Sequence, residues 1–142
     1  MAEEILAKIK EKFSWQILNI FEKSLRRAYI DLKPENIKEI VEFIFRRLRA
    51  RFVIVSAVDT RNAIEILYHF SFDSVGKIIT LRTKIDKENP EIESITPIIK
   101  GAEWIEREIY ELLGVRFKNH PNLKRLLLAE DWPEGKYPLR RE

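Results

Sequence analysis

The chain has 142 residues, of which 45% are hydrophobic and 35% charged, with a formal net charge of +3. This length fits one domain with its own core, and so small a net charge argues against nucleic-acid binding. The absence of cysteine excludes disulfides, thiolate zinc sites and iron–sulfur ligation by this chain. No apolar run reaches about 18 residues and the acidic N-terminus does not resemble a signal peptide, so we expect a cytoplasmic protein.

The first half of the sequence predicts two helices separated by two strands. Residues 2–12 have the period of an amphipathic helix, and residues 15–21 and 28–32 have the length or alternation of strands. A second helix is expected to begin at Pro34, because proline suits the first helical position. We interpret its C-terminal arginines as residues that favour the negative end of the helix dipole, with a docking patch for an acidic partner as the alternative; they are Arg46, Arg47 and Arg49.

The second half predicts three strands, a polar link, a helix and an arm. The first strand, 52–58, is almost continuously apolar, which favours a central position in the sheet. The order α-β-β-α-β-β-β predicts an α+β fold, a two-layer α/β sandwich with a mixed sheet of about five strands. The polar link spans 84–97, and the helix is expected to end at Gly114. We therefore divide the chain into an α/β domain, 1–114, and an extended partner-binding tail, 115–142.

The terminal helix is crowded with charged residues that have two interpretations. Glu103, Arg107 and Glu111 are spaced to form ion pairs within the helix, each worth a few tenths of a kcal/mol. Alternatively, Glu106, Arg107 and Glu108 meet charges on another subunit, or buried carboxylates hold a proton. No nucleotide-binding loop is present, which argues against an independent NAD, flavin or nucleoside-triphosphate enzyme.

Three further features lie outside the helix. His120 stands before Pro121 in a loop, where a structural, hydrogen-bonded role is favoured over a base or ligand. His69 lies within a predicted strand, on the face opposite Tyr68, and is assigned no function. The apolar residues of the tail either fold back on the sheet or are buried in a partner; they are Leu126, Leu127, Leu128 and Trp132.

The abundance of Ile, Glu, Lys and Arg is typical of proteins from hot environments.

The segment from Trp104 to Glu142 resembles the signature of the 30 kDa subunit of respiratory NADH:quinone oxidoreductase, complex I. The same family includes the corresponding subunit of membrane-bound [NiFe] hydrogenases and related archaeal complexes. This chain departs from the signature at Glu111, where aspartate is usual, at Asn119, where glycine is usual, and at Lys124, which replaces arginine. The residues in register are Trp104, Glu106, Arg107, Glu108, Tyr110, Gly114, His120, Pro121, Leu123, Arg125, Pro138, Leu139 and Arg140.

The resemblance implies a non-catalytic subunit in the peripheral arm of a membrane complex, on the cytoplasmic face. The chain would bind no cofactor or metal; iron–sulfur clusters, and nickel–iron in hydrogenases, would belong to its partners. These would be a large [NiFe]-hydrogenase-like subunit and an iron–sulfur small subunit, with no nucleic acid and membrane contact only through the complex. The expected partner-binding residues are Trp104, Glu106, Arg107, Glu108, Glu111, His120, Pro121, Arg125, Trp132, Pro138, Leu139 and Arg140.

Several complexes contain such a subunit. We favour an archaeal ferredoxin-linked [NiFe] hydrogenase or its sulfur-reducing relative, because of the short chain and its composition. The 30 kDa subunit of an NADH- or deazaflavin-linked quinone oxidoreductase is the alternative within the class. A free-standing interaction adaptor is the alternative from a different class. In each complex-bound case we expect the tail, 115–142, to become ordered only against partner subunits.

Overall fold

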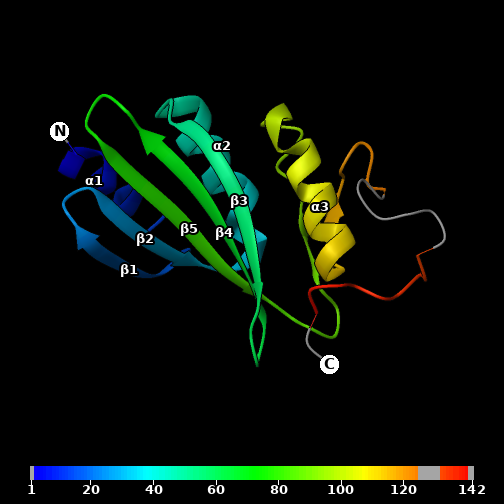
Figure 1. Cartoon of the computed structure of the whole chain (residues 1–142). Coiled ribbons are helices and arrows are strands. Elements are labelled where there is room, and N and C mark those ends of the chain that lie inside the picture. Colours follow the sequence, from blue (N-terminus) through cyan, green and yellow to red (C-terminus); the bar gives the residue numbers. More distant parts are fainter. Residues whose placement is uncertain (1, 125–131, 141–142) are drawn as a thin grey trace.

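A five-stranded mixed sheet forms the body of the protein in a computed structural model that describes residues 2–124 and 132–140. The strands lie in the order β1-β2-β5-β4-β3, and a separate two-stranded sheet pairs β6 with β7. The predicted α+β class is confirmed, as is the order of the helices and of the five strands of the main sheet (Figure 1). The elements are α1 (Ala2–Lys12), β1 (Ile17–Ser24), β2 (Arg27–Leu32), α2 (Ile37–Glu42), β3 (Arg51–Asp59), β4 (Ile64–Phe72), β5 (Lys77–Ile85), β6 (Glu91–Glu93), α3 (Glu103–Leu113) and β7 (Arg116–Lys118).

Short helical turns join several of these elements. A 3₁₀ turn, Pro34–Asn36, leads into α2, and a π-helical turn, Phe43–Arg47, extends it. A second 3₁₀ turn, Lys100–Ala102, precedes α3. Within the main sheet β2 and β5 run parallel, whereas the other neighbours are antiparallel. Parallel neighbours need a long connection, which α2, β3 and β4 supply between β2 and β5.

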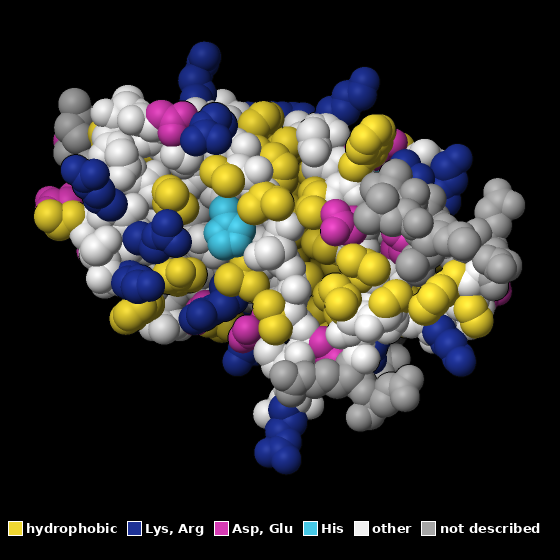
Figure 2. Space-filling model, in the orientation of Figure 1, with side chains coloured by type: hydrophobic (Ala, Val, Ile, Leu, Met, Phe, Trp, Pro, Cys, Tyr) yellow, Lys and Arg dark blue, Asp and Glu magenta, His cyan; other side chains and the backbone are white. Residues whose placement is uncertain are grey.

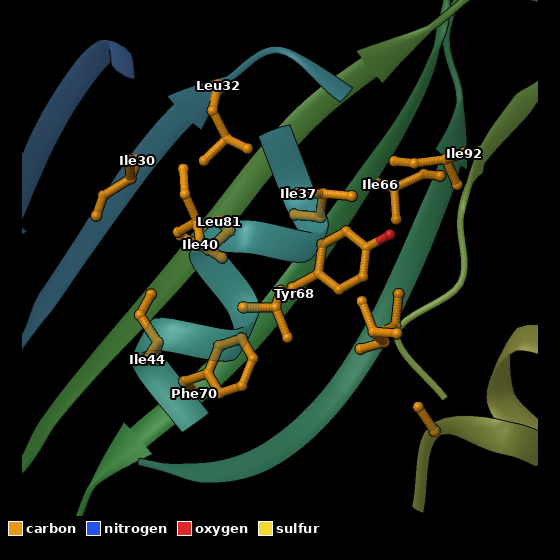
Figure 3. Close-up of a cluster of buried hydrophobic side chains, with 14 of the residues drawn as sticks. Ile30, Leu32, Ile37, Ile40, Ile44, Ile66, Tyr68, Phe70, Leu81 and Ile92 are labelled. Atoms are coloured by element: carbon orange, nitrogen blue, oxygen red, sulfur yellow. The ribbon is translucent and has the colours of Figure 1, made fainter. Parts of the chain in front are cut away.

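The main core lies between the sheet and the two N-terminal helices. Alternate residues of the strands point to this side, and α1 and α2 cover it (Figure 1). Figure 3 shows α2 lying over β2, β4 and β5 with its isoleucines directed at the sheet. Burial of each such side chain contributes about 1.5–3 kcal/mol. The residues labelled there are Ile30, Leu32, Ile37, Ile40, Ile44, Ile66, Tyr68, Phe70, Leu81 and Ile92.

The structure corrects the predicted position of β3. Its apolar run predicted a central strand, but β3 ends the strand order and is an edge strand. Val53, Ile54 and Val58 are about half exposed, at 43%, 45% and 50%. A strand with apolar residues on both faces can be buried within its own sheet, or can expose one face for another molecule to cover, and local sequence does not distinguish the two.

The predicted link and the predicted tail also contain structure. The link includes β6, whose parallel partner β7 lies in the segment assigned to the tail. Val115 and Phe117 are buried, so the predicted boundary after Gly114 is no break in packing. These strands were not predicted, because three residues are too few to show the alternation of apolar and polar residues and because each strand's partner is distant in the sequence. Gly114 itself ends α3 in a left-handed conformation, φ 78°, as expected.

Candidate functional site

Helix α3 places most of its charged residues inside the protein. Glu106, Arg107 and Glu111 are all buried, together with Ile109 and Leu113. The helix is anchored at its C-terminal end by Gly114, whose N–H donates to the Tyr110 carbonyl at 2.9 Å. The signature residues therefore lie largely against the chain's own loops.

The Glu106 carboxylate binds the segment just after β6. Its Oε1 accepts hydrogen bonds from the hydroxyls of Ser94 and Thr96, each at 2.5 Å, and its Oε2 accepts the N–H of Ile95 at 3.0 Å. The side chain is fully buried. Carboxylates prefer several strong donors when they are removed from water, and three are provided here. We refer to Glu106, Ser94, Ile95 and Thr96 as the Glu106 clasp.

Burial and hydrogen bonding act in opposite directions on the Glu106 carboxyl. Burial raises its pKa, and the donors of Ser94, Thr96 and Ile95 partly counter this rise. The pKa of the Tyr68 phenol is raised well above its ordinary value, first by burial and second by the charge of Glu106. The expectation that Glu106 meets a charge on another subunit does not fit a side chain with no exposed surface whose oxygens serve its own chain.

His120 supports the same region through both of its ring nitrogens. Its Nδ1 accepts the N–H of Asn122 at 3.0 Å, so the ring proton must be on Nε2. That nitrogen is 3.0 Å from the Glu103 carbonyl, to which it donates. The structural role favoured for His120 thus agrees with its contacts, and the loop begins at Asn119, which has the left-handed conformation, φ 65°.

The remaining signature residues divide into buried and exposed groups. Arg107 donates from Nε to the Lys124 carbonyl at 3.0 Å, which ties α3 to the loop after β7. Glu111 is buried and also makes an interaction within the chain. Trp104, by contrast, is 67% exposed, and Glu108 is half-buried. Among the predicted partner-binding residues of the tail, four are exposed: Pro121, Trp132, Pro138 and Leu139. Arg125 lies outside the described residues, as do Leu126, Leu127 and Leu128.

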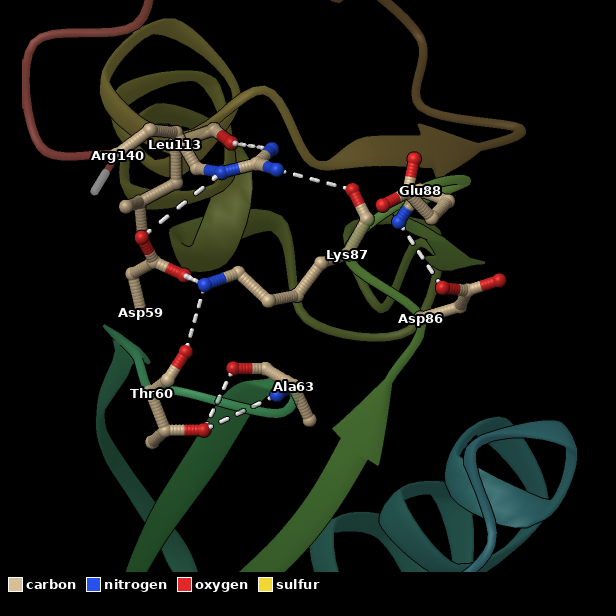
Figure 4. A network of polar contacts seen from close by, with 8 residues as sticks. All are labelled: Asp59, Thr60, Ala63, Asp86, Lys87, Glu88, Leu113 and Arg140. Atoms are coloured by element: carbon tan, nitrogen blue, oxygen red, sulfur yellow. Dashed lines mark hydrogen bonds and ion pairs between the residues drawn. The ribbon is translucent and has the colours of Figure 1, made fainter. Parts of the chain in front are cut away.

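The C-terminal segment returns to the body through a polar network (Figure 4). Arg140 donates to the Leu113 carbonyl at 3.1 Å and to the Lys87 carbonyl at 2.9 Å. Its Nε lies 3.9 Å from Asp59 Oδ2, and the Lys87 ammonium lies 2.7 Å from Asp59 Oδ1. Sequence reasoning missed Asp59 and Lys87, because their partners are distant in the chain and no local motif marks them.

His69 lies on the face of the main sheet that points away from α1 and α2. Its register places Ile54 of β3 beside His69 of β4, and His69 beside Thr80 of β5. The imidazole bridges Ser56 Oγ at 3.1 Å and Thr80 Oγ1 at 2.9 Å. Burial lowers the pKa of His69, and the nearby charge of Arg27 lowers it further. Figure 2 shows hydrophobic side chains gathered beside a histidine over the middle of this face.

Neither a metal centre nor a membrane span is found in the part of the chain that the structure describes. In residues 2–124 and 132–140, no group of three or more histidine, aspartate or glutamate side chains is arranged to hold a metal ion. Over the same ranges, no helix has the length and apolarity needed to cross a bilayer.

Comparisons with known proteins give a consistent result. A subunit of the F(420)H(2) dehydrogenase of Methanosarcina mazei is 38% identical over 119 residues, which are 82% of this chain and 73% of that protein. Formate hydrogenlyase subunit 5 of Escherichia coli is 28% identical over all of this chain, which corresponds to only 26% of that protein. The fold resembles a chain of the membrane-bound sulfane sulfur reductase, an archaeal respiratory membrane complex, with a TM-score of 0.85, 23% identity, and coverage of 97% of this chain and 82% of that one.

The family is identified by the match of residues 30–142 to the model described as respiratory-chain NADH dehydrogenase, 30 Kd subunit. That range includes the end of β2 and the rest of the main sheet after it, the Glu106 clasp and the C-terminal network. The relatives are named as subunits of oxidoreductases, as the resemblance implied. The chain therefore belongs to the 30 kDa subunit family of complex I-like oxidoreductases.

Proposed function

We propose that the chain is a non-catalytic subunit in the peripheral, cytoplasmic arm of a complex I-like membrane-bound oxidoreductase. The main support for this proposal is that charged residues of the family signature bind other segments of the same chain. Glu106 and Arg107 bind loop segments, and His120 is held between two backbone groups. Such residues maintain shape, because their donors and acceptors are already engaged.

The expected partners are a large [NiFe]-hydrogenase-like subunit and an iron–sulfur small subunit. The exposed apolar residues beside α3 support a docking role, because such groups mark interfaces when they gather on one side of a protein. Trp104 lies at the start of α3, and the Leu139 N–H binds the Leu112 carbonyl near its end. We propose that this side and the sheet face around His69 are covered by the large subunit.

The long E. coli relative supports an adjacent large partner. The segment similar to this chain occupies about a quarter of formate hydrogenlyase subunit 5, so it is joined there to much more polypeptide. Covalent linkage keeps two parts at high effective concentration, which fits segments that act side by side. In this chain the same association would have to come from surface contacts.

Two types of complex are favoured by particular observations. The extent of the fold likeness to the sulfane sulfur reductase supports a ferredoxin-linked hydrogenase or sulfur-reducing complex. The 38% identity to the F(420)H(2) dehydrogenase subunit supports a deazaflavin-linked complex instead. We propose the first, and the electron donor accepted by the purified complex distinguishes them.

The test is purification of the native complex from membranes through a tag on this chain. We expect a large subunit and an iron–sulfur subunit to co-purify, with turnover that depends on reduced ferredoxin. The free chain is expected to be colourless and redox-silent, in line with its lack of cysteine. A stoichiometric flavin or cluster in the free chain, or a chain that never associates with oxidoreductase subunits, would contradict the proposal.

A further inference from the structure

Four large apolar side chains line the β1 edge of the main sheet, at the opposite end of the strand order from β3. Trp15 is 94% exposed, Leu18 61%, Phe21 54% and Leu25 76%. We call these residues the β1 stripe. Leu18 and Phe21 are in β1, whereas Trp15 is in the turn before it and Leu25 is in the turn after it. Successive members are three or four residues apart, at most about 10–13 Å along the chain, so one partner can reach them all. Exposed apolar residues are ordinary singly, but a row of four is typical of an interface.

The net positive charge of the protein falls within the segment of the sequence that carries the stripe. Residues 8–27 hold six lysines and arginines and two glutamates, a net charge of +4, whereas the other residues together carry −1. The six basic side chains are all exposed. Figure 2 shows dark-blue side chains among yellow ones at the end of the molecule that carries α1, β1 and β2. A matching surface must therefore be apolar and negatively charged.

The geometry of β1 argues against two other occupants. Pairing of a partner strand along the edge is disfavoured, because the register of β1 shifts between Ile17 and Asn19 and again between Glu22 and Ser24. Such irregularities bend an edge strand and interrupt its ladder. A second copy of this chain would bring the same basic residues together, and like charges across an interface are unfavourable. We therefore expect the side chains of the stripe to contact a different protein, without strand pairing.

The contacts of the stripe favour a protein over a lipid surface. Phe21 is held against Tyr29, with ring centroids 6.3 Å apart, on the side of the sheet that also carries His69. Aromatic residues fixed on a strand and flanked by arginines have the composition of protein–protein hot spots. The relatives are subunits of assemblies, so protein surfaces are available to cover it.

We infer that the β1 stripe is a second docking surface, which fits an apolar surface rimmed with carboxylates on another subunit of the same complex. This inference rests on the proposed function, since the partner is a neighbour in that assembly. It adds a separate contact at the far end of the sheet from α3. The chain would then bridge two neighbours, with the rigid sheet setting the distance between them.

The first test is a photo-crosslinking amino acid at Leu18 in the purified native complex. We expect it to crosslink to one subunit, within a peptide that carries aspartate or glutamate beside apolar residues. The control position is Arg61, which is exposed in the turn between β3 and β4. A complex that contains its large and small subunits but gives no crosslink at Leu18 contradicts the stripe alone. Failure of those subunits to co-purify contradicts the proposed function.

A pair of opposite charge changes provides the second test. Glu22 and Lys23 are adjacent and exposed, so Lys23→Glu and Glu22→Lys change the local charge by equal amounts in opposite directions. In reassembly of a complex stripped of this chain, Lys23→Glu should weaken binding roughly tenfold at low salt and Glu22→Lys should strengthen it. Both effects should shrink at high salt, because salt screens exposed charges. Equal affinities for the two variants would overturn the inference.

A third measurement distinguishes a protein partner from a lipid surface. The free chain is mixed with vesicles of phosphatidylglycerol and, as a control, of phosphatidylcholine, and its tryptophan fluorescence is compared with that of Trp15→Phe. We expect no vesicle binding under conditions in which reassembly is complete. A blue shift that requires Trp15 and anionic vesicles would assign the stripe to a bilayer and overturn the protein partner.

Discussion

The Glu106 clasp and the β1 stripe distribute polarity in opposite ways. In the clasp a carboxylate is fully buried and satisfied by two hydroxyls and a backbone N–H. In the stripe four large apolar residues are exposed, up to the 94% of Trp15. A buried charge is tolerated only with partners, whereas exposed apolar groups gain little until something covers them. Charged residues of the signature can thus stabilise the fold, whereas exposed apolar residues outside the signature are available to bind a partner.

This difference has a measurable consequence. Substitutions in the Glu106 clasp should lower the stability of the free chain, because they remove contacts within that chain. Changes in exposed apolar residues should leave the free chain intact and affect only the complex. Substitutions in the two kinds of region can therefore show whether stability and assembly are separable in this protein.

Glu106→Ala should lower the free energy of unfolding of the free chain by about 3–5 kcal/mol. The reason is that the buried donors of Ser94, Ile95 and Thr96 lose their acceptor. Urea unfolding followed by circular dichroism measures the effect, and Glu106→Gln, which keeps one acceptor oxygen, should lose less. If the Ala variant were as stable as the parent but failed to assemble, the carboxylate would serve a partner after all.

Gly114→Ala should cost about 1–3 kcal/mol, because the position has φ 78°. In addition, a Cβ at this position would lie 2.6 Å from Tyr137 Cε2. The substitution should therefore also loosen the C-terminal segment, which amide hydrogen exchange at Tyr137, Leu139 and Arg140 would report. Gly101→Ala is the matched control, since nothing lies within 4 Å of a Cβ there. Equal effects of the two substitutions would refute this account.

Arg140→Met should cost about 1–2 kcal/mol through loss of the bonds to the Leu113 and Lys87 carbonyls. It should also weaken the attachment of the C-terminal segment, so that the amide hydrogens of Tyr137 and Leu139 exchange faster. Thermal unfolding and hydrogen exchange of the free chain test both effects. Slow exchange retained in the variant would show that Tyr137 and Leu139 hold the segment without the polar network. Fast exchange in the parent would instead support a tail that orders only on its partners.

The pH dependence of the clasp follows from the raised pKa of Glu106. A carboxyl whose folded pKa exceeds its unfolded value contributes most to stability below the unfolded pKa, and loses this contribution as pH rises through the folded pKa. The stability of the parent relative to Glu106→Gln should therefore fall as pH increases from about 4.5, the ordinary glutamate value, and then level off. Urea unfolding at a series of pH values tests the sign, and a rise would mean that the hydrogen bonds outweigh burial.

Trp104→Ala should change the stability of the free chain by less than about 0.5 kcal/mol, because the side chain is 67% exposed. It should nevertheless weaken assembly, since exposed aromatic residues are common hot spots. Thermal unfolding of the free chain and co-purification of the complex report the two outcomes separately. A marked loss of stability without loss of assembly would place Trp104 with the clasp and not with the docking surface.

Local sequence was enough to predict the order of the helices and of the main-sheet strands, and the end of α3, but not β6 and β7. Periodicity and turn residues are local properties, so α1, the hairpins and the left-handed Gly114 could be predicted from them. The signature residues around Trp104 likewise identified the family, because they lie close together in the chain. Their roles did not follow, since neighbouring residues of one helix can face the core or the solvent.

Which polar and apolar groups are enclosed was decided by the tertiary structure. The Glu106 clasp joins residues 10–12 positions apart, and Arg140 reaches Lys87 across 53 positions. The apolar run of β3 became an edge strand because β5 pairs with β2 and β4. The same pairing left β1 at the other edge with Trp15 and Leu18 exposed. Burial depends on how distant segments pack together, and no local pattern encodes which edge of a sheet is left for another molecule.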